Sequence, residues 1–205
     1  MSLSSIPIYL PPDKAELRQG EIVTGLLHSA LTGESLVQYM TSGNATDNKT
    51  SVVRYEYALV MTQDCDLEQD FTIRESGGTS DKLLQHILFC EAAPADSFHE
   101  DSALKSREIR KHFTNNKMER YQYLGAIDAS VDSERKGIVA LGLDFKRYFT
   151  IPTELVYLQL QNGAKRRARL AVPFAEHLSD RFFAYHARIA LPVQHHTREG
   201  KEPAG

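Results

Sequence analysis

The clearest hydrophobic pattern in the chain runs from Val53 to Met61. Every second residue there is apolar or aromatic, which is the period of a half-buried strand. The side chains that this alternation assigns to the core are Val53, Tyr55, Tyr57, Leu59 and Met61. The sequence therefore predicts one continuous strand over residues 53–61, with one face buried.

Shorter apolar runs predict further strands on both sides of this one. A strand starts in Gln19–Val23, and another covers Leu83–Cys90 after the turn-forming residues 76–80. Three later segments have the same character: 121–127, 138–145 and 155–160. The polar stretch 41–51 is expected to be a loop, because Ser, Thr, Asn and Asp dominate it.

Helical signals come late in the chain. Residues 101–113 open with acidic residues and continue with basic ones, which suits a short surface helix and its dipole. A second helix is predicted from Pro173 to Pro192, with an apolar stripe at three- and four-residue spacing. The stripe consists of Phe174, Leu178, Phe182, Tyr185 and Ile189.

Several strands with helices added late favour a mainly β, α+β fold, a small antiparallel β-barrel with a mid-chain and a C-terminal helix. Residues 1–19 contain three prolines and are expected to form an extended N-terminal segment, which precedes a single domain over 20–193. Residues 194–205 are expected to be a flexible polar tail.

Composition narrows the class of protein. The chain has 205 residues, 41% of them hydrophobic and 25% charged, which is typical of a globular domain and excludes collagen and bulk disorder. Its two cysteines exclude a disulfide scaffold. No window approaches the roughly 18 apolar residues of a membrane span, and the N-terminus lacks a signal-peptide pattern. We therefore expect a cytoplasmic protein with no membrane partner.

Charge is distributed unevenly along the chain. Residues 1–100 hold 6 Lys or Arg and 15 Asp or Glu, whereas residues 101–205 hold 18 and 12. Such segregation has two interpretations. The basic half can face an anionic partner, or the two halves can neutralise each other inside the fold.

Basic and aromatic residues alternate in three clusters of the second half. This interleaving suits phosphate contacts combined with base stacking, so we predict a surface that binds RNA or another nucleic acid. The predicted contacts are Lys117, Arg120, Tyr121, Lys146, Arg147, Lys165, Arg166 and Arg167. The alternative is a charged face that docks an acidic protein segment.

A cluster of polar groups, Thr62-Gln63-Asp64-Cys65-Asp66, directly follows the predicted strand over 53–61. Together with the start Gly20-Glu21-Ile22-Val23 and the run 87–91, this arrangement resembles the PemK/MazF group of SH3-like barrels. The resemblance implies a prokaryotic toxin-type endoribonuclease, with an antitoxin-like protein partner or a homodimer as possible assemblies.

In that family an Arg precedes the strand, and a Ser or Thr ends it. Thr62 matches the hydroxyl position, but Glu56 stands where the Arg belongs. Cleavage through the RNA 2′-hydroxyl needs a base and a cation, so Arg54, two residues before Glu56, is the candidate replacement. Asp64 and Asp66 complete the candidate catalytic set. The alternative function is a non-enzymatic protein-interaction module with a degraded catalytic site.

Cys65 suggests a third function, a thiol hydrolase. Its neighbours Asp64 and Asp66 would raise the pKa of the thiol and oppose thiolate formation, so a buried core cysteine is the preferred interpretation.

Residues 64–75 place oxygen side chains as an EF-hand loop does, but position six is Gln69 instead of Gly. A looser divalent-ion site at Asp64, Asp66 and Glu91 is the alternative to our expectation of no metal and no cofactor.

Asp144, at the end of an apolar strand, is expected to pair with Arg181 or Arg188.

Overall fold

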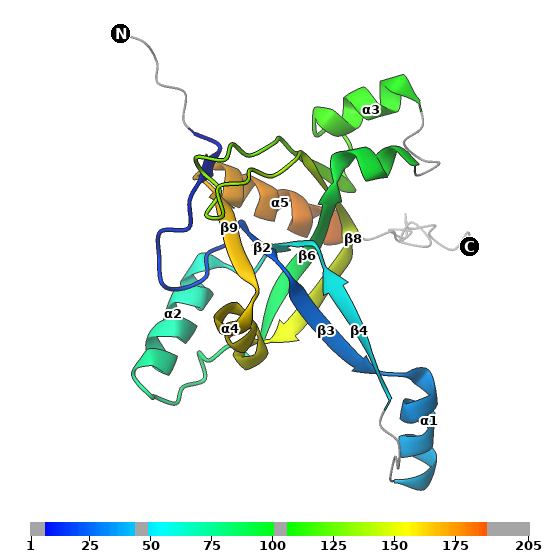
Figure 1. Cartoon of the computed structure of the whole chain (residues 1–205), viewed down its shortest axis with the longest axis vertical. Coiled ribbons are helices and arrows are strands. Elements are labelled where there is room, and N and C mark those ends of the chain that lie inside the picture. Colours follow the sequence, from blue (N-terminus) through cyan, green and yellow to red (C-terminus); the bar gives the residue numbers. More distant parts are fainter. Residues whose placement is uncertain (1–6, 44–48, 101–105, 188–205) are drawn as a thin grey trace, which may run out of the picture.

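The computed structural model describes residues 7–43, 49–100 and 106–187. A seven-stranded antiparallel sheet in the order β1-β9-β2-β5-β6-β8-β7 forms its body. The strands are β1 (Tyr9–Leu10), β2 (Glu21–Thr24), β5 (Tyr57–Val60), β6 (His86–Pro94), β7 (Tyr121–Leu124), β8 (Leu141–Pro152) and β9 (Lys165–Leu170). The sheet curls into a half-barrel, and helix α5 (Phe174–His186) lies against its upper part in the view of Figure 1. The mainly β, α+β fold class with β-barrel character is confirmed.

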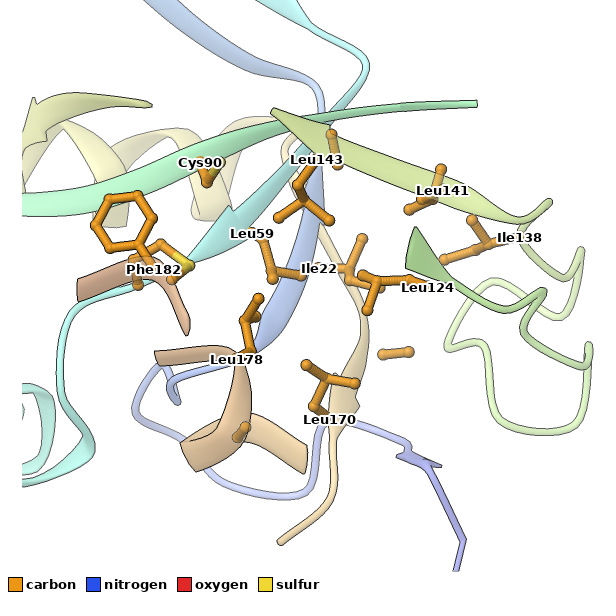
Figure 2. Close-up of a cluster of buried hydrophobic side chains, with 14 of the residues drawn as sticks. Ile22, Leu59, Cys90, Leu124, Ile138, Leu141, Leu143, Leu170, Leu178 and Phe182 are labelled. Carbon is orange, nitrogen blue, oxygen red and sulfur yellow. The ribbon is translucent and has the colours of Figure 1, made fainter. Parts of the chain in front are cut away.

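Both faces of the central strand β5 are buried. Leu59 packs with Ile22, Leu143 and Leu178 in the cluster between sheet and α5 (Figure 2). Ala58 and Val60 point to the opposite side, where helices α2 (Asp64–Glu75) and α4 (Thr153–Asn162) supply Leu67 and Val156. Because neither face meets solvent, β5 is a rigid base for the residues at its two ends.

The predicted strand over 53–61 is two strands. It breaks at Glu56 into β4 (Thr50–Tyr55) and β5, opposite Gly25, whose φ of 79° lies in the left-handed region. On the N-terminal side of the break, β4 pairs with β3 (Leu26–Leu31), and these two strands form a separate sheet. Val53 is therefore exposed, and its predicted place in the core is wrong.

Strands β3 and β4, with helix α1 (Gly33–Ser42) at their far end, form a projecting hairpin that we call the arm (Figure 1). Helix α1 begins at Thr32, whose side chain accepts a hydrogen bond from the Ser35 backbone N–H. Only the ends of the predicted loop over 41–51 lie in these elements, residues 41–42 in α1 and residues 50–51 in β4, while residues 44–48 lie outside the described residues.

The predicted strand over 155–160 is also wrong, because this segment lies in helix α4. Val156 is buried while Leu155 and Leu158 are exposed, an arrangement with helical period. A short apolar run does not distinguish strand from helix by periodicity alone. The helix ends at Asn162, and the N–H of the following Gly163 donates to the Gln159 carbonyl.

The other elements agree more closely with the sequence. The mid-chain helix is α3 (Arg107–Thr114), preceded by a 3₁₀ turn over Ala95–Glu100; residues 101–105 lie outside the described residues. The C-terminal helix is α5, and Ile189, Arg188 and the tail over 194–205 also lie outside them. After Met61 the chain forms helix α2, which excludes an EF-hand loop over residues 64–75.

The two oppositely charged halves of the chain pair with each other. Glu21 pairs with Arg166, Glu91 with Arg147 and Asp13 with Arg169. Much of the charge asymmetry is therefore neutralised within the fold. Within residues 7–43, 49–100 and 106–187, no helix has the length and apolar character needed to cross a membrane.

A candidate active-site cleft at the root of the arm

A cleft of about 550 Å³ opens where the arm joins the sheet. It is lined by Thr24, Gly25, Arg54, Glu56, Tyr57, Glu134, Gly163, Lys165 and Arg167. Two candidate catalytic residues, Arg54 and Glu56, thus meet two predicted nucleic-acid contacts, Lys165 and Arg167. These four side chains come from strands far apart in the sequence.

Strand pairing explains the meeting. In the sheet, Thr24 of β2 lies opposite Lys165 of β9, and Val23 lies opposite Ala58 of β5. The ends of β2 and β9 and the break at Glu56 therefore lie together. A Cβ at Gly25 would lie 3.8 Å from the Arg54 Nη2 atom, an ordinary van der Waals distance, so the left-handed φ of 79° is what favours glycine at this bend.

The wall of the cleft is a buried ion pair. Arg167 Nε donates to Asp132 Oδ1 at 2.7 Å, and Nη2 donates to Oδ2 at 2.6 Å. The hydrogen bonds from Arg167 outweigh burial and lower the pKa of Asp132 to about 2. Arg167 is therefore fixed in place, with a further contact of 3.4 Å from Nη1 to Glu134.

The groups in front of this wall are different. Arg54, Glu56 and Lys165 are exposed, and none of them forms a hydrogen bond or ion pair within the described part of the chain. Burial, and after it the charge of Glu56, raises the pKa of Tyr57 beside them. The cleft thus offers one carboxylate and two cations that the fold does not engage.

The remaining candidate catalytic residues lie at the other end of β5. Thr62 Oγ1 accepts a hydrogen bond from the Leu88 N–H at 2.8 Å. Asp64 accepts one from Arg18 Nη2 and one from the Gln19 N–H, both at 2.6 Å. Asp66 is exposed in the first turn of α2. The candidate catalytic set is therefore divided between two places.

The prediction that Cys65 is buried is wrong, because it is exposed and Cys90 is the buried cysteine. Burial, with smaller contributions from Asp144 and Glu91, raises the pKa of the Cys90 thiol. No group of three or more His, Cys, Asp or Glu side chains is placed to hold a metal ion among the residues described.

The predicted nucleic-acid contacts are dispersed, and several are engaged by the fold. Arg166 donates to Glu21 through Nε at 2.6 Å and to three carbonyls of residues 14–16. Arg120 binds Asp144 through Nε at 2.8 Å and lies over the ring of Tyr121. Arg147 lies 3.6 Å from Glu91, while Lys117 and Lys146 are exposed. Lys165 is the contact that remains available in the cleft.

The expected partner of Asp144 is also corrected. Arg120, instead of Arg181, binds this carboxylate. Burial tends to raise the pKa of Asp144, but hydrogen bonds from Arg120 and the Lys146 N–H outweigh it and lower the pKa. Arg181 donates to the carbonyls of Asn116, Met118 and Tyr121.

Sequence reasoning missed five lining residues: Thr24, Gly25, Tyr57 as a cleft residue, Glu134 and Gly163. Gly25 interrupts an apolar strand pattern, which is a signal for a bend or a close approach. Glu134 lies in an irregular segment and gave no comparable signal.

Searches of protein-family models, curated proteins and solved structures found no match to this chain.

Proposed function

We propose that the protein is a PemK/MazF-like, SH3-like barrel that binds RNA in the cleft at the root of the arm and cleaves it. The observation that carries this proposal is the meeting of exposed Arg54, Glu56 and Lys165 in one cleft. None of the three is held by a neighbour among the described residues, so each is available to a ligand. Their residue types match the needs of RNA cleavage, a base and cations for a phosphate.

In the proposed reaction Glu56 accepts the proton of a ribose 2′-hydroxyl. The 2′-oxygen then attacks the adjacent phosphorus, the bond to the 5′-oxygen breaks, and a 2′,3′-cyclic phosphate forms. Arg54 and Lys165 stabilise the negative charge of the phosphorane. The departing 5′-oxygen takes a proton from water, and the hydroxide that remains takes the proton from Glu56, which restores the carboxylate. Tyr57 supplies an aromatic ring against which an unpaired base can pack.

The test is cleavage of a fluorescent single-stranded RNA. Glu56→Gln and Arg54→Ala should each reduce the cleavage rate by about 10²–10⁴-fold, the usual contribution of a positioned acid–base group. The melting temperature should remain nearly unchanged, because both side chains are exposed.

Matched controls are Glu68→Gln and Lys82→Ala, exposed residues away from the cleft, which should leave the rate unchanged. An oligonucleotide with 2′-deoxyribose at the cleaved position should bind without being cleaved. Full activity of Glu56→Gln, or a parent protein that neither binds nor cleaves RNA at low salt, would overturn the proposal.

A second candidate function, a protein-interaction module, is favoured by the arm. Eight of the exposed large apolar residues lie on it: Leu27, Leu31, Leu36, Val37, Tyr39, Met40, Val52 and Val53. Leu27, Leu31 and Val52 share one face of the β3–β4 hairpin, because Leu27 lies opposite Arg54, Ser29 opposite Val52 and Leu31 opposite Thr50. We propose a second copy of this chain as the occupant, because an apolar face on an arm that projects from the body can pack against the same face of another copy in a two-fold dimer.

The oligomeric state decides this second proposal. The parent protein should be a dimer by light scattering after size exclusion, and Val37→Glu combined with Met40→Glu should be a monomer. The control, Val139→Glu combined with Val172→Glu, alters exposed apolar residues of the body and should remain dimeric. A monomeric parent, or a dimeric arm variant, would contradict the proposed interface.

A further inference from the structure

A second cavity lies at the opposite end of β9 from the cleft. It has a volume of about 420 Å³ and lies between β1, β7 and α5. Its apolar lining includes Leu124, Leu170 and Leu178, which come from three different elements (Figure 2). This volume falls in the range of small-molecule sites, about 300–1,000 Å³.

One polar side chain in this lining, that of Gln122, is buried with one of its polar atoms unpaired among the described residues. Gln122 of β7 is only 6% exposed, and its Nε2 donates to the Tyr123 carbonyl at 3.1 Å. Its Oε1 is buried and has no hydrogen-bond partner among the described residues. A buried acceptor without a donor is costly, so such a group in a native fold calls for an explanation.

The fold does not need the Gln122 amide. The Tyr123 carbonyl that it bonds already accepts a hydrogen bond from Asn116 Nδ2 at 3.1 Å. Asn116 also accepts one from the Tyr123 N–H through Oδ1, at 2.6 Å. The backbone at Tyr123 is therefore satisfied without Gln122, and an apolar side chain of similar size would avoid the unpaired oxygen.

The other polar groups nearby differ from Gln122. The Tyr9 hydroxyl donates to the Gly125 carbonyl at 2.9 Å, and His177 is exposed on α5. Gln122 is thus the lining residue whose buried acceptor is free. The χ3 torsion of a glutamine is soft, so its amide can turn the oxygen towards a donor in the cavity while Asn116 keeps the Tyr123 carbonyl bonded.

We propose that this cavity binds a small, largely apolar molecule that carries one N–H or O–H donor, and that Gln122 accepts the hydrogen bond from that donor. Apolar walls with a few placed polar groups are typical of such sites. The site is separate from the RNA cleft and does not depend on the function proposed there. Gln122 is a specificity residue, because it favours ligands with a donor over ligands of the same shape without one.

Indole and 1-methylindole are matched probes, since both are flat and apolar but only indole has an N–H donor. Titration followed by amide chemical shifts should show that indole moves the signals of Leu124 and Leu170. 1-Methylindole should bind about tenfold more weakly, the effect of one hydrogen bond of ordinary strength.

Gln122→Leu supplies the decisive variant. It should bind the two probes with equal affinity and, without ligand, melt at a higher temperature than the parent. The control Gln161→Leu, on an exposed residue of α4, should keep the preference for indole. Absence of shifts at the cavity, equal affinity of the parent for both probes, or a lower melting temperature of Gln122→Leu would overturn the proposal; the last result would assign Gln122 a structural role.

Discussion

The two ends of strand β5 carry similar residue types in different situations. Before the strand, Arg54 and Glu56 are exposed and have no partner within the described residues. After it, Thr62 and Asp64 accept hydrogen bonds that join β5 to β6 and to the segment before β2. A group that can act on a ligand must be free to meet it, so the first end is suited to chemistry and the second to stability.

The comparison also separates two kinds of arginine within the cleft. Arg167 is buried against Asp132 and shapes the wall, whereas Arg54 projects into solvent near Gly25. The Arg167–Asp132 pair fixes the wall of the cleft, and the unpaired groups that line the cleft remain available to a ligand. This arrangement is expected of a preorganised anion site. The predictions below test whether engaged and free groups differ as this comparison requires.

The largest effect on stability is expected at the wall of the cleft. Asp132→Ala leaves the buried guanidinium of Arg167 without its main partner, which typically costs about 3–5 kcal/mol of folding free energy. Denaturation by urea should show the loss. The control Asp180→Ala, an exposed carboxylate of α5, should leave the stability nearly unchanged.

The same pair predicts an effect of acid. The pKa of Asp132 is about 2 in the folded protein, below its ordinary value of 3.8, so the folded state favours the charged carboxylate. Its contribution is complete above pH 3.8 and is lost as pH falls through about 2. Stability of the parent should decline over this window more steeply than that of Asp132→Ala. Parallel curves would contradict the pairing.

The local pattern of the sequence predicted what depends on neighbouring residues. The start of β2, the burial of Leu59 and the stripe on α5 all follow from short-range periodicity. The Asp132–Arg167 pair joins positions 35 residues apart, and no local pattern reveals it. For the same reason the sequence could not separate free Lys165 from engaged Arg166, although they are adjacent.

The errors in secondary structure have a related cause. The apolar run over 155–160 fits either a strand or the buried face of a helix. In the structure it is a helix, in which Val156 is buried while Leu155 and Leu158 are exposed. The strand breaks at Glu56, although the apolar alternation continues through this position. The departure of the arm depends on Gly25, which lies between β2 and β3, far from Glu56 in the sequence.

At the engaged end of β5, Asp64→Asn is expected to have an intermediate effect. Asp64 accepts charge-assisted hydrogen bonds from Arg18 and from the Gln19 backbone, each typically worth about 1.5–3 kcal/mol. Asparagine retains one oxygen, so the free energy of unfolding should fall by about 1–3 kcal/mol. The control Asp66→Asn alters an exposed neighbour. Equal stability of the two variants would show that Asp64 is not engaged in solution.

The smallest effect is expected for Thr62→Val, which keeps the shape of the side chain and removes the oxygen that accepts the Leu88 N–H. Loss of one neutral hydrogen bond at a half-buried position should lower the free energy of unfolding by about 1 kcal/mol. Thr150→Val, at an exposed position of β8, is the matched control and should change it less. RNA cleavage by Thr62→Val should equal that of the parent, because the hydroxyl oxygen holds two strands together away from the cleft. A variant with unchanged stability but no cleavage would reverse the comparison, and the reacting group would then lie at the end of β5 that the PemK/MazF resemblance indicates.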